Sequence, residues 1–257
     1  RQTPSTGFRP SGDGPQPLVS MSHGRATQDR RAGQGRQRYE HLARYLVRKG
    51  FVVLVPTRVG YGETYGDFDP EDAGGCNVMR VEPVSMAASD QVLATLEFAR
   101  TLSYVDAQRW VAIGQSVGGL TTVAVAWRNP PGLVAAINFA GGAGGDPERR
   151  PGEPCLPVQI ERLWGSKAAS VTVPMLWLYW TNDKYWGEAH PKRWHQAFTA
   201  GGGAAEFHSL PAAGSDGHGA LAFVMDTWVP LVEADLARAG FTRPGTIDRP
   251  PATTFAR

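Results

Sequence analysis

Apolar residues along this chain follow two periodicities. Short apolar runs, typical of buried strands, are separated by longer stretches in which apolar residues recur at helical spacing. The runs predict strands at 18–22, 51–56, 109–114, 133–139, 175–180 and 205–210. The helical stretches predict helices at 36–49, 84–101, 116–127, 191–200 and 218–239. This alternation is typical of an α/β fold, a mostly parallel sheet with helices on both faces.

Three stretches depart from the alternation. Residues 1–16 are predicted to be irregular or to form an edge strand, for which only 7–10 have a suitable sequence. The proline-containing segment 241–257 is predicted to be an irregular tail. Between Phe139 and Met175 the chain is rich in glycine and proline and too short for a large helical lid. We therefore expect a small or absent cap over an open cleft. A chain of 257 residues is expected to form a single domain.

The most informative motif is Gly114-Gln115-Ser116-Val117-Gly118, placed between an apolar run and a helical stretch. A strand that turns sharply into a helix strains its central residue, and the flanking glycines remove Cβ atoms that would clash. The motif predicts that Ser116 is exposed above the sheet as a nucleophile. The helix beginning there aims free backbone N–H groups at a neighbouring oxygen, so the N–H of Val117 is a predicted oxyanion donor.

A serine nucleophile needs a neutral imidazole to take its proton. His218 lies in a glycine-rich segment after the last predicted strand, where loops at the carboxyl ends of parallel strands converge, and is the predicted base. Asp183 follows the strand before it and is the predicted carboxylate that orients the imidazole. Asp216, two residues before His218, is the competing acid.

The other histidines fit structural or surface roles better. His190 and His195 lie in sequence of helical periodicity, His208 lies in a short predicted strand, and His41 lies on an early predicted amphipathic helix. His23 stands in a tight turn and is interpreted as a structural hydrogen-bonding residue rather than a base.

The remaining parts of a site come from loops after strands. The turn at Gly24 allows the backbone N–H of Arg25 to point at the substrate oxygen, which makes it the second predicted oxyanion donor. Tyr61, in a glycine-rich loop, and the pair Tyr185 and Trp186, just after Asp183, are predicted to line the substrate pocket. Packing in the core explains Tyr185 and Trp186 about as well.

These motifs together resemble the α/β-hydrolase superfamily over roughly residues 17–238. They are Ser22-His23-Gly24, Arg58-Val59-Gly60-Tyr61-Gly62, the pentapeptide around Ser116, Asn182-Asp183 and Asp216-Gly217-His218. The chain looks closest to the dienelactone-hydrolase-like branch. The resemblance implies an α/β-hydrolase fold, a Ser116, His218 and Asp183 triad, and backbone donors at Val117 and Arg25. Dienelactone hydrolases proper carry a cysteine nucleophile, so their lactone substrate is not carried over to this serine-containing chain.

The expected function is that of a serine esterase that cleaves carboxylic esters through an acyl-enzyme, with no cofactor and no metal. Two alternatives stay open: an amidase or peptidase with the same triad, and a non-catalytic binding protein of the same fold. The expected partner is a small-molecule or bulky ester. The sequence indicates neither the acyl and alcohol specificity nor the oligomeric state.

Charge and composition limit the classes of binding partner and the cellular compartment that we expect for the protein. A net charge of +2 with interspersed signs argues against nucleic acid, and no apolar run approaches the roughly 20 residues that cross a bilayer. Cys76 and Cys155 lie in loops that could meet at the rim of the site, so we expect a disulfide, with two free thiols as the alternative. Together with a start at Arg1 that suggests a removed leader, this favours a secreted or periplasmic protein over a cytoplasmic one.

Overall fold

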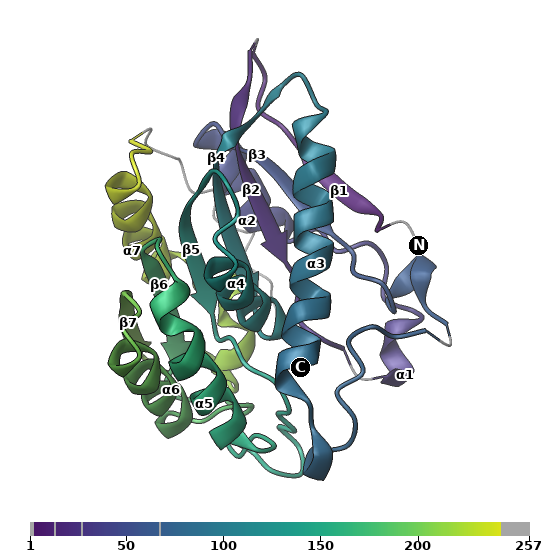
Figure 1. Cartoon of the computed structure of the whole chain (residues 1–257), viewed down its shortest axis with the longest axis vertical. Coiled ribbons are helices and arrows are strands. Elements are labelled where there is room, and N and C mark those ends of the chain that lie inside the picture. Colours follow the sequence, from purple (N-terminus) through teal and green to yellow (C-terminus); the bar gives the residue numbers. More distant parts are fainter. Residues whose placement is uncertain (1–2, 13, 27, 67, 243–257) are drawn as a thin grey trace.

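Seven strands form one sheet in the part of the chain that the computed structural model describes, residues 3–12, 14–26, 28–66 and 68–242 (Figure 1). In chain order they are β1 (Ser5–Phe8), β2 (Gln16–Ser22), β3 (Val52–Pro56), β4 (Val105–Gln115), β5 (Leu133–Phe139), β6 (Met175–Trp180) and β7 (Ala205–Leu210). Their order across the sheet is β1-β3-β2-β4-β5-β6-β7. β1 pairs antiparallel with β3 and the other neighbouring strands pair in parallel, which confirms the mostly parallel sheet.

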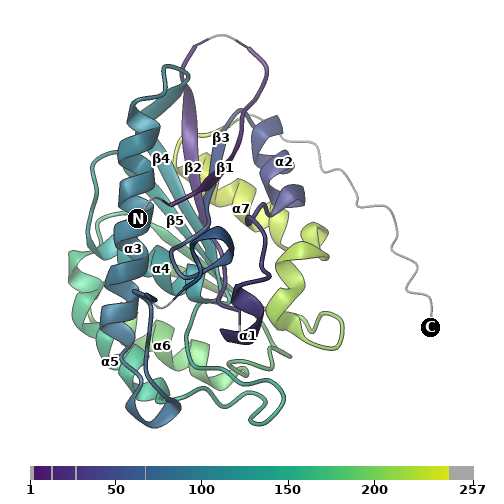
Figure 2. The ribbon, with the colours of Figure 1, turned by 90° about the vertical axis from the view of Figure 1, so that its right-hand side faces the viewer.

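Helices cover both faces of this sheet, as predicted (Figure 2). The α-helices are α1 (Gln28–Arg31), α2 (Glu40–Arg48), α3 (Val81–Arg100), α4 (Val117–Trp127), α5 (Pro157–Lys167), α6 (Ala189–Ala200) and α7 (Met225–Arg238). Helices α3 to α6 share one hydrophobic cluster, and α2 and α7 share another on the opposite face.

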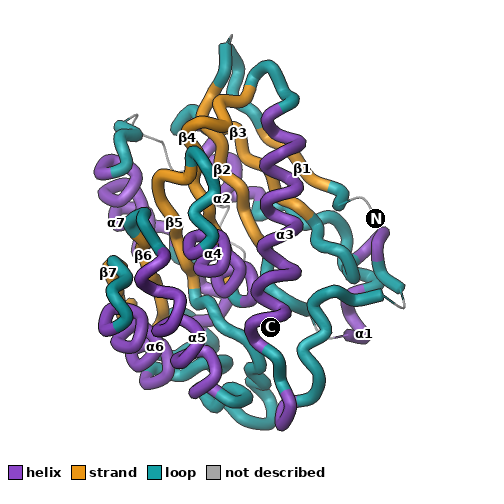
Figure 3. The backbone as a smooth tube through the Cα atoms, viewed as in Figure 1, coloured by secondary structure: helices purple, strands orange, loops and turns teal. Residues whose placement is uncertain are grey.

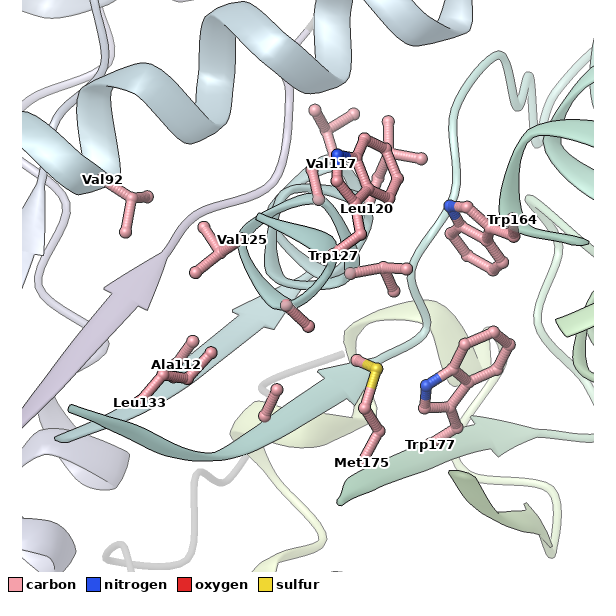
Figure 4. Close-up of a cluster of buried hydrophobic side chains, with 14 of the residues drawn as sticks. Val92, Ala112, Val117, Leu120, Val125, Trp127, Leu133, Trp164, Met175 and Trp177 are labelled. Carbon is pink, nitrogen blue, oxygen red and sulfur yellow. The ribbon is translucent and has the colours of Figure 1, made fainter. Parts of the chain in front are cut away.

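The two clusters follow from the alternation of side chains along each strand. In β4, Trp110 and Ala112 face the first cluster while Val111 and Ile113 face the second. On the first face, the ring of Trp164 from α5 lies against Trp177 of β6, with their centroids 4.8 Å apart (Figure 4). A sheet whose two faces are both buried explains why its strands read as continuous apolar runs.

The sequence prediction missed the short helix α1 and helix α5, and it placed the start of α7 seven residues too early. Helix α5 lies within the glycine- and proline-rich segment 140–174, where no helix was predicted. Its proline stands in the first turn, where a missing N–H costs no hydrogen bond, and Ile160, Leu163 and Trp164 are buried at helical spacing. The helix predicted at 218–239 begins at Met225 instead, preceded by a 3-10 turn over Gly217–Ala222.

An edge strand lies near the amino end, and only residues 241 and 242 of the predicted tail are described. The edge strand at the amino end is β1, which begins two residues before the segment 7–10 that was expected to form it. Of the predicted tail, Phe241 packs against Phe51 with ring centroids 4.8 Å apart, and residues 243–257 lie outside the described residues. None of the described helices has both the length and the apolar character to cross a membrane.

Loops gather at the carboxyl ends of the parallel strands, at the lower end of the molecule in Figure 3. A disulfide joins two of them, from Cys76 in the segment before α3 to Cys155 in the segment before α5. The predicted pairing of these two cysteines is therefore present, and it closes a loop whose ends are 79 residues apart in sequence.

Replacing Cys76 and Cys155 with serine is expected to lower the free energy of unfolding by about 2–4 kcal/mol, because the unfolded chain regains the freedom that the long closed loop removes. Urea unfolding followed by tryptophan fluorescence measures the change. An unchanged midpoint, with the wild type verified to contain no free thiol, would contradict the expectation.

Candidate functional site

Ser116 occupies a strained turn between β4 and α4. Its φ of 59° and ψ of −124° lie in a region that residues with a Cβ seldom adopt. Both neighbouring glycines are required by close backbone approach. A Cβ at Gly114 would lie 2.0 Å from the carbonyl oxygen of Gly118, and a Cβ at Gly118 would lie 2.0 Å from that of Ser22. The turn therefore places Ser116 at the amino end of α4, at the wall of a cavity.

His218 and Asp183 form a buried hydrogen-bonded pair. The Nδ1 atom of His218 is 2.9 Å from Oδ2 of Asp183. Because a carboxylate only accepts, Nδ1 carries the hydrogen, and in a neutral imidazole Nε2 is then the acceptor. The other oxygen of Asp183 accepts the backbone N–H groups of Tyr185 and Trp186, at 2.7 and 3.1 Å. These bonds fix the carboxylate so that its free edge faces the imidazole.

Aromatic rings enclose this imidazole. The ring of Tyr185 stacks on His218 with 3.9 Å between centroids, and Trp186 meets it edge-on at 5.3 Å. Tyr185 and Trp186 also line the cavity that Ser116 lines. Tyr185 and Trp186 thus connect the buried pair of His218 and Asp183 with the cavity at whose wall Ser116 lies.

Asp216, the competing acid, has a different set of partners. Its Oδ1 accepts the backbone N–H of His218 and that of Lys184, both at 3.0 Å. It therefore ties the loop that carries His218 to the loop that carries Asp183, while the imidazole itself pairs with Asp183.

The loop after β2 lies directly against the nucleophile. A Cβ on Gly24 would lie 3.2 Å from the Cβ of Ser116 and 2.9 Å from Oε1 of Gln115, so the loop leaves little room for a side chain here. His23 in this loop is fully buried, and burial together with the charge of Arg58 holds the pKa of its imidazole well below the ordinary value. The neutral ring donates from Nδ1 to the carbonyl of Gly24, at 2.6 Å, and accepts the N–H of Arg58, at 3.1 Å. His23 is thus placed as the structural residue that the sequence predicts.

A buried ion pair that sequence reasoning missed lies behind the same loop. Arg58 donates from Nε to Glu71 at 2.6 Å and from Nη1 to the carbonyl of His23 at 2.7 Å. Burial alone would lower the pKa of Arg58, but the neighbouring Glu71 and Tyr61 raise it above the ordinary value. Gln91 donates to the same Glu71 oxygen at 3.3 Å. The only sequence signal for this ion pair was an arginine in a glycine-rich loop. Nothing in the sequence around Glu71, 13 residues later, marks it as the partner of Arg58.

The cavity beside Ser116 has a volume of about 670 Å³. One part of its wall is apolar or sulfur-containing and is formed by Cys76, Met79, Val84, Ala143 and Cys155. Another part is charged and is formed by Arg25, Arg30, Arg31, Asp146, Glu148 and Arg149. Val117 and Arg25, the predicted oxyanion donors, both belong to the wall.

Tyr61 does not take the position expected of it. It is fully buried, lies 4.7 Å from the His23 ring between centroids, and is absent from the described residues that line the cavity. Burial raises the pKa of Tyr61 to about 12. Its glycine-rich loop folds inward beneath the loop after β2, so the ring packs behind the site rather than inside the pocket.

Three of the other histidines have partners outside this site. His190 lies 3.3 Å from Glu153, His195 lies 2.8 Å from the carbonyl of Ala205, and His208 lies 2.6 Å from Glu206. Within the described residues, no group of three or more His, Cys, Asp or Glu side chains is arranged to hold a metal ion.

Comparison with known proteins places these features in a family context. The family model for the dienelactone hydrolase family matches residues 32–222. A search of curated proteins gives no match.

Solved structures with a similar fold include esterases and peptidases. A Klebsiella pneumoniae protein assigned to the dienelactone hydrolases shares 20% identity, covering 92% of this chain and 93% of its own, with a TM-score of 0.61. Est1E from Butyrivibrio proteoclasticus, with ferulic acid bound, shares 16% identity over 91% of this chain and 95% of its own, with a TM-score of 0.61. An acylaminoacyl peptidase from Pyrococcus horikoshii shares 15% identity over 95% of this chain but 40% of its own, with a TM-score of 0.63. At these identities the likeness supports the fold alone.

The pairing of the imidazole predicts unequal effects for the two aspartates. Asp183→Asn is expected to lower kcat/KM for an ester about 10³- to 10⁴-fold, because the amide no longer holds the imidazole in the required tautomer. Asp216→Ala removes an acceptor from two backbone N–H groups and is expected to cost about tenfold. Hydrolysis of p-nitrophenyl butyrate by both folded variants measures this. Equal losses of kcat/KM in the two variants would contradict the assignment of Asp183, rather than Asp216, as the acid.

The buried pair Arg58 and Glu71 predicts a large loss of stability. Glu71→Gln leaves the Arg58 guanidinium buried without a counter-charge and is expected to lower the free energy of unfolding by about 3–5 kcal/mol. Glu63→Gln is the matched control, since Glu63 pairs with Arg36 at 2.8 Å on the exposed surface, where solvent screens the pair, and this substitution is expected to change the stability little. Urea denaturation of both variants gives the comparison, and similar losses would contradict it.

Proposed function

The chain belongs to the dienelactone hydrolase family, and from this premise we propose that it is a serine hydrolase that cleaves carboxylic esters through an acyl-enzyme. The observation that carries the proposal is a strained Ser116 at the wall of a cavity whose other wall residues, Tyr185 and Trp186, pack on the imidazole of a buried His218 and Asp183 pair. A structural serine has no need of backbone strain, which costs about 1–3 kcal/mol.

The proposed reaction begins with attack of the Ser116 Oγ on the acyl carbon, while Nε2 of His218 takes the hydroxyl proton. The carbonyl oxygen becomes an oxyanion, which the backbone N–H groups of Val117 and Arg25 stabilise. Collapse of this intermediate breaks the ester bond, and His218 returns the proton to the leaving alcohol. A water molecule, deprotonated by His218, then hydrolyses the acyl-enzyme and restores Ser116. Asp183 keeps the imidazole oriented and stabilises its cationic form throughout.

The cavity wall suggests how an ester would lie. Tyr185 and Trp186 border both the cavity and the imidazole, so we assign them to substrate contact near the scissile bond. The apolar wall beside Met79 and Val84 suits the acyl group or an apolar alcohol. The disulfide in the same wall supports export to an oxidising compartment, secreted or periplasmic.

Amide or peptide hydrolysis is the second candidate, favoured by the fold shared with acylaminoacyl peptidase. The same residues serve both reactions, but an amide requires protonation of a poorer leaving group. A p-nitroanilide that matches the best p-nitrophenyl ester in its acyl part separates the two, because an esterase is expected to prefer the ester by several orders of magnitude in kcat/KM.

Substitution of the nucleophile tests the proposal. The wild type is expected to hydrolyse p-nitrophenyl esters of graded acyl length, and Ser116→Ala is expected to lose about 10³-fold or more in kcat. A fluorophosphonate probe should label the wild type at Ser116 and leave folded Ser116→Ala unlabelled. Equal activity of the two proteins, or absence of both labelling and hydrolysis in the folded wild type, would reject a serine hydrolase and favour a binding role.

A further inference from the structure

Three hydrogen bonds join the loop after β2, the turn at Ser116 and the loop of His218. The backbone N–H of Gly24 donates to the hydroxyl of Tyr39 at 3.2 Å. That hydroxyl donates to Oε1 of Gln115 at 3.2 Å, and Nε2 of Gln115 donates to the carbonyl oxygen of His218 at 3.0 Å. We call these two side chains, Tyr39 and Gln115, the Tyr39–Gln115 bridge.

Each group of the bridge has one role available to it. The carbonyl of His218 only accepts, so the amide nitrogen of Gln115 must face it, and the amide oxygen must face Tyr39. The hydroxyl of Tyr39 then donates to Gln115 and accepts from Gly24. Burial raises the pKa of Tyr39, so the phenol keeps the hydrogen that it donates. The direction of the whole chain is therefore determined by its two backbone ends.

Both side chains stand next to unusual backbone. Tyr39 precedes α2 with φ 46° and ψ 48°, in the left-handed region that favours glycine, and Gln115 immediately precedes the strained Ser116. A tyrosine in left-handed backbone directs its side chain to a place that a regular helix start would not reach. Neither residue is among the described residues that line the cavity, so substrate contact does not explain them.

We propose that Tyr39 and Gln115 are positioning residues that hold the oxyanion loop and the base in register with the nucleophile. The proposal rests on the proposed function. One end of the bridge is Gly24, which precedes the oxyanion donor Arg25, and the other end is the backbone of the base itself. Arg58 and His23 hold the loop from behind and Asp183 holds the imidazole from its far side. The bridge is the direct link between these two halves of the site.

Tyr39→Phe is the sharpest test, because it removes only the hydroxyl. We expect kcat to fall about 10- to 100-fold, since a small misplacement of an oxyanion donor raises the barrier without changing substrate contacts. KM is expected to stay within about threefold, and the pH dependence of kcat/KM is expected to keep its shape. Gln115→Leu is expected to behave in the same way.

Tyr45→Phe is the matched control. Tyr45 lies in α2, and its hydroxyl donates a comparable bond of 3.1 Å to Glu233, away from the site. It is expected to retain the kcat of the wild type. A fall in kcat as large as that of Tyr39→Phe would show that loss of a buried hydroxyl is a general structural effect, and the inference would be wrong.

The double variant Tyr39→Phe/Gln115→Leu tests the link itself. If the two side chains act as one bridge, the double variant loses no more than about the larger single loss. Losses that multiply would overturn the bridge. If Tyr39→Phe does not fold, Gln115→Leu against the same control decides by its kcat and KM.

Rates of Ser116 labelling by the fluorophosphonate keep this test separate from the proposed function. A wild type that neither reacts with the probe nor hydrolyses esters would refute the serine hydrolase. A wild type that does both, with Tyr39→Phe and Gln115→Leu labelled and turning over at wild-type rates, would refute the bridge alone.

Discussion

The close approach of three backbone segments at Ser116 is the constraint on which the site depends. The end of β4, the start of α4 and the loop after β2 meet so closely that Cβ atoms at Gly114 and Gly118 would lie 2.0 Å from carbonyl oxygens. Only that compression allows one residue to turn the chain from strand to helix. It also brings Gly24 against Ser116, so the strain at the nucleophile and the placement of the neighbouring loop are two results of one packing arrangement.

Polar groups forced into this interior are held mainly by groups that lie far away in sequence. Arg58 and Glu71 support the carbonyl of His23, and Asp216 accepts N–H groups from two separate loops. Buried polar groups are costly unless paired, so these contacts favour the one arrangement of the loops in which they form. Rigid loops on a parallel sheet are what a preorganised oxyanion site requires.

Sequence reasoning located what local chemistry determines and missed what depends on distant partners. Strands at 133–139, 175–180 and 205–210 have the predicted bounds, because glycine, proline or polar residues lie close to their ends. The pairing of His218 with Asp183 was predicted from chain order. Helix α5 was missed because glycine and proline outweighed three buried residues at helical spacing. Tyr61 was placed in the pocket because exposure cannot be judged from a loop sequence, and the ion pair of Arg58 escaped notice because Glu71 has no local signature.

A serine in place of the cysteine of dienelactone hydrolases proper makes these supporting contacts more important. A thiol ionises readily, so a thiolate can exist before substrate arrives, whereas a serine hydroxyl must lose its proton as it attacks. Nucleophile, base and oxyanion donors must then be aligned at the same moment. In this chain the hydrogen bonds of Asp183, Asp216, Tyr39 and Gln115 connect the segments that carry the residues proposed for these roles. Attack by a serine with simultaneous proton transfer depends on such alignment more than attack by a preformed thiolate does. This dependence is a physical reason for a site that is supported from several sides.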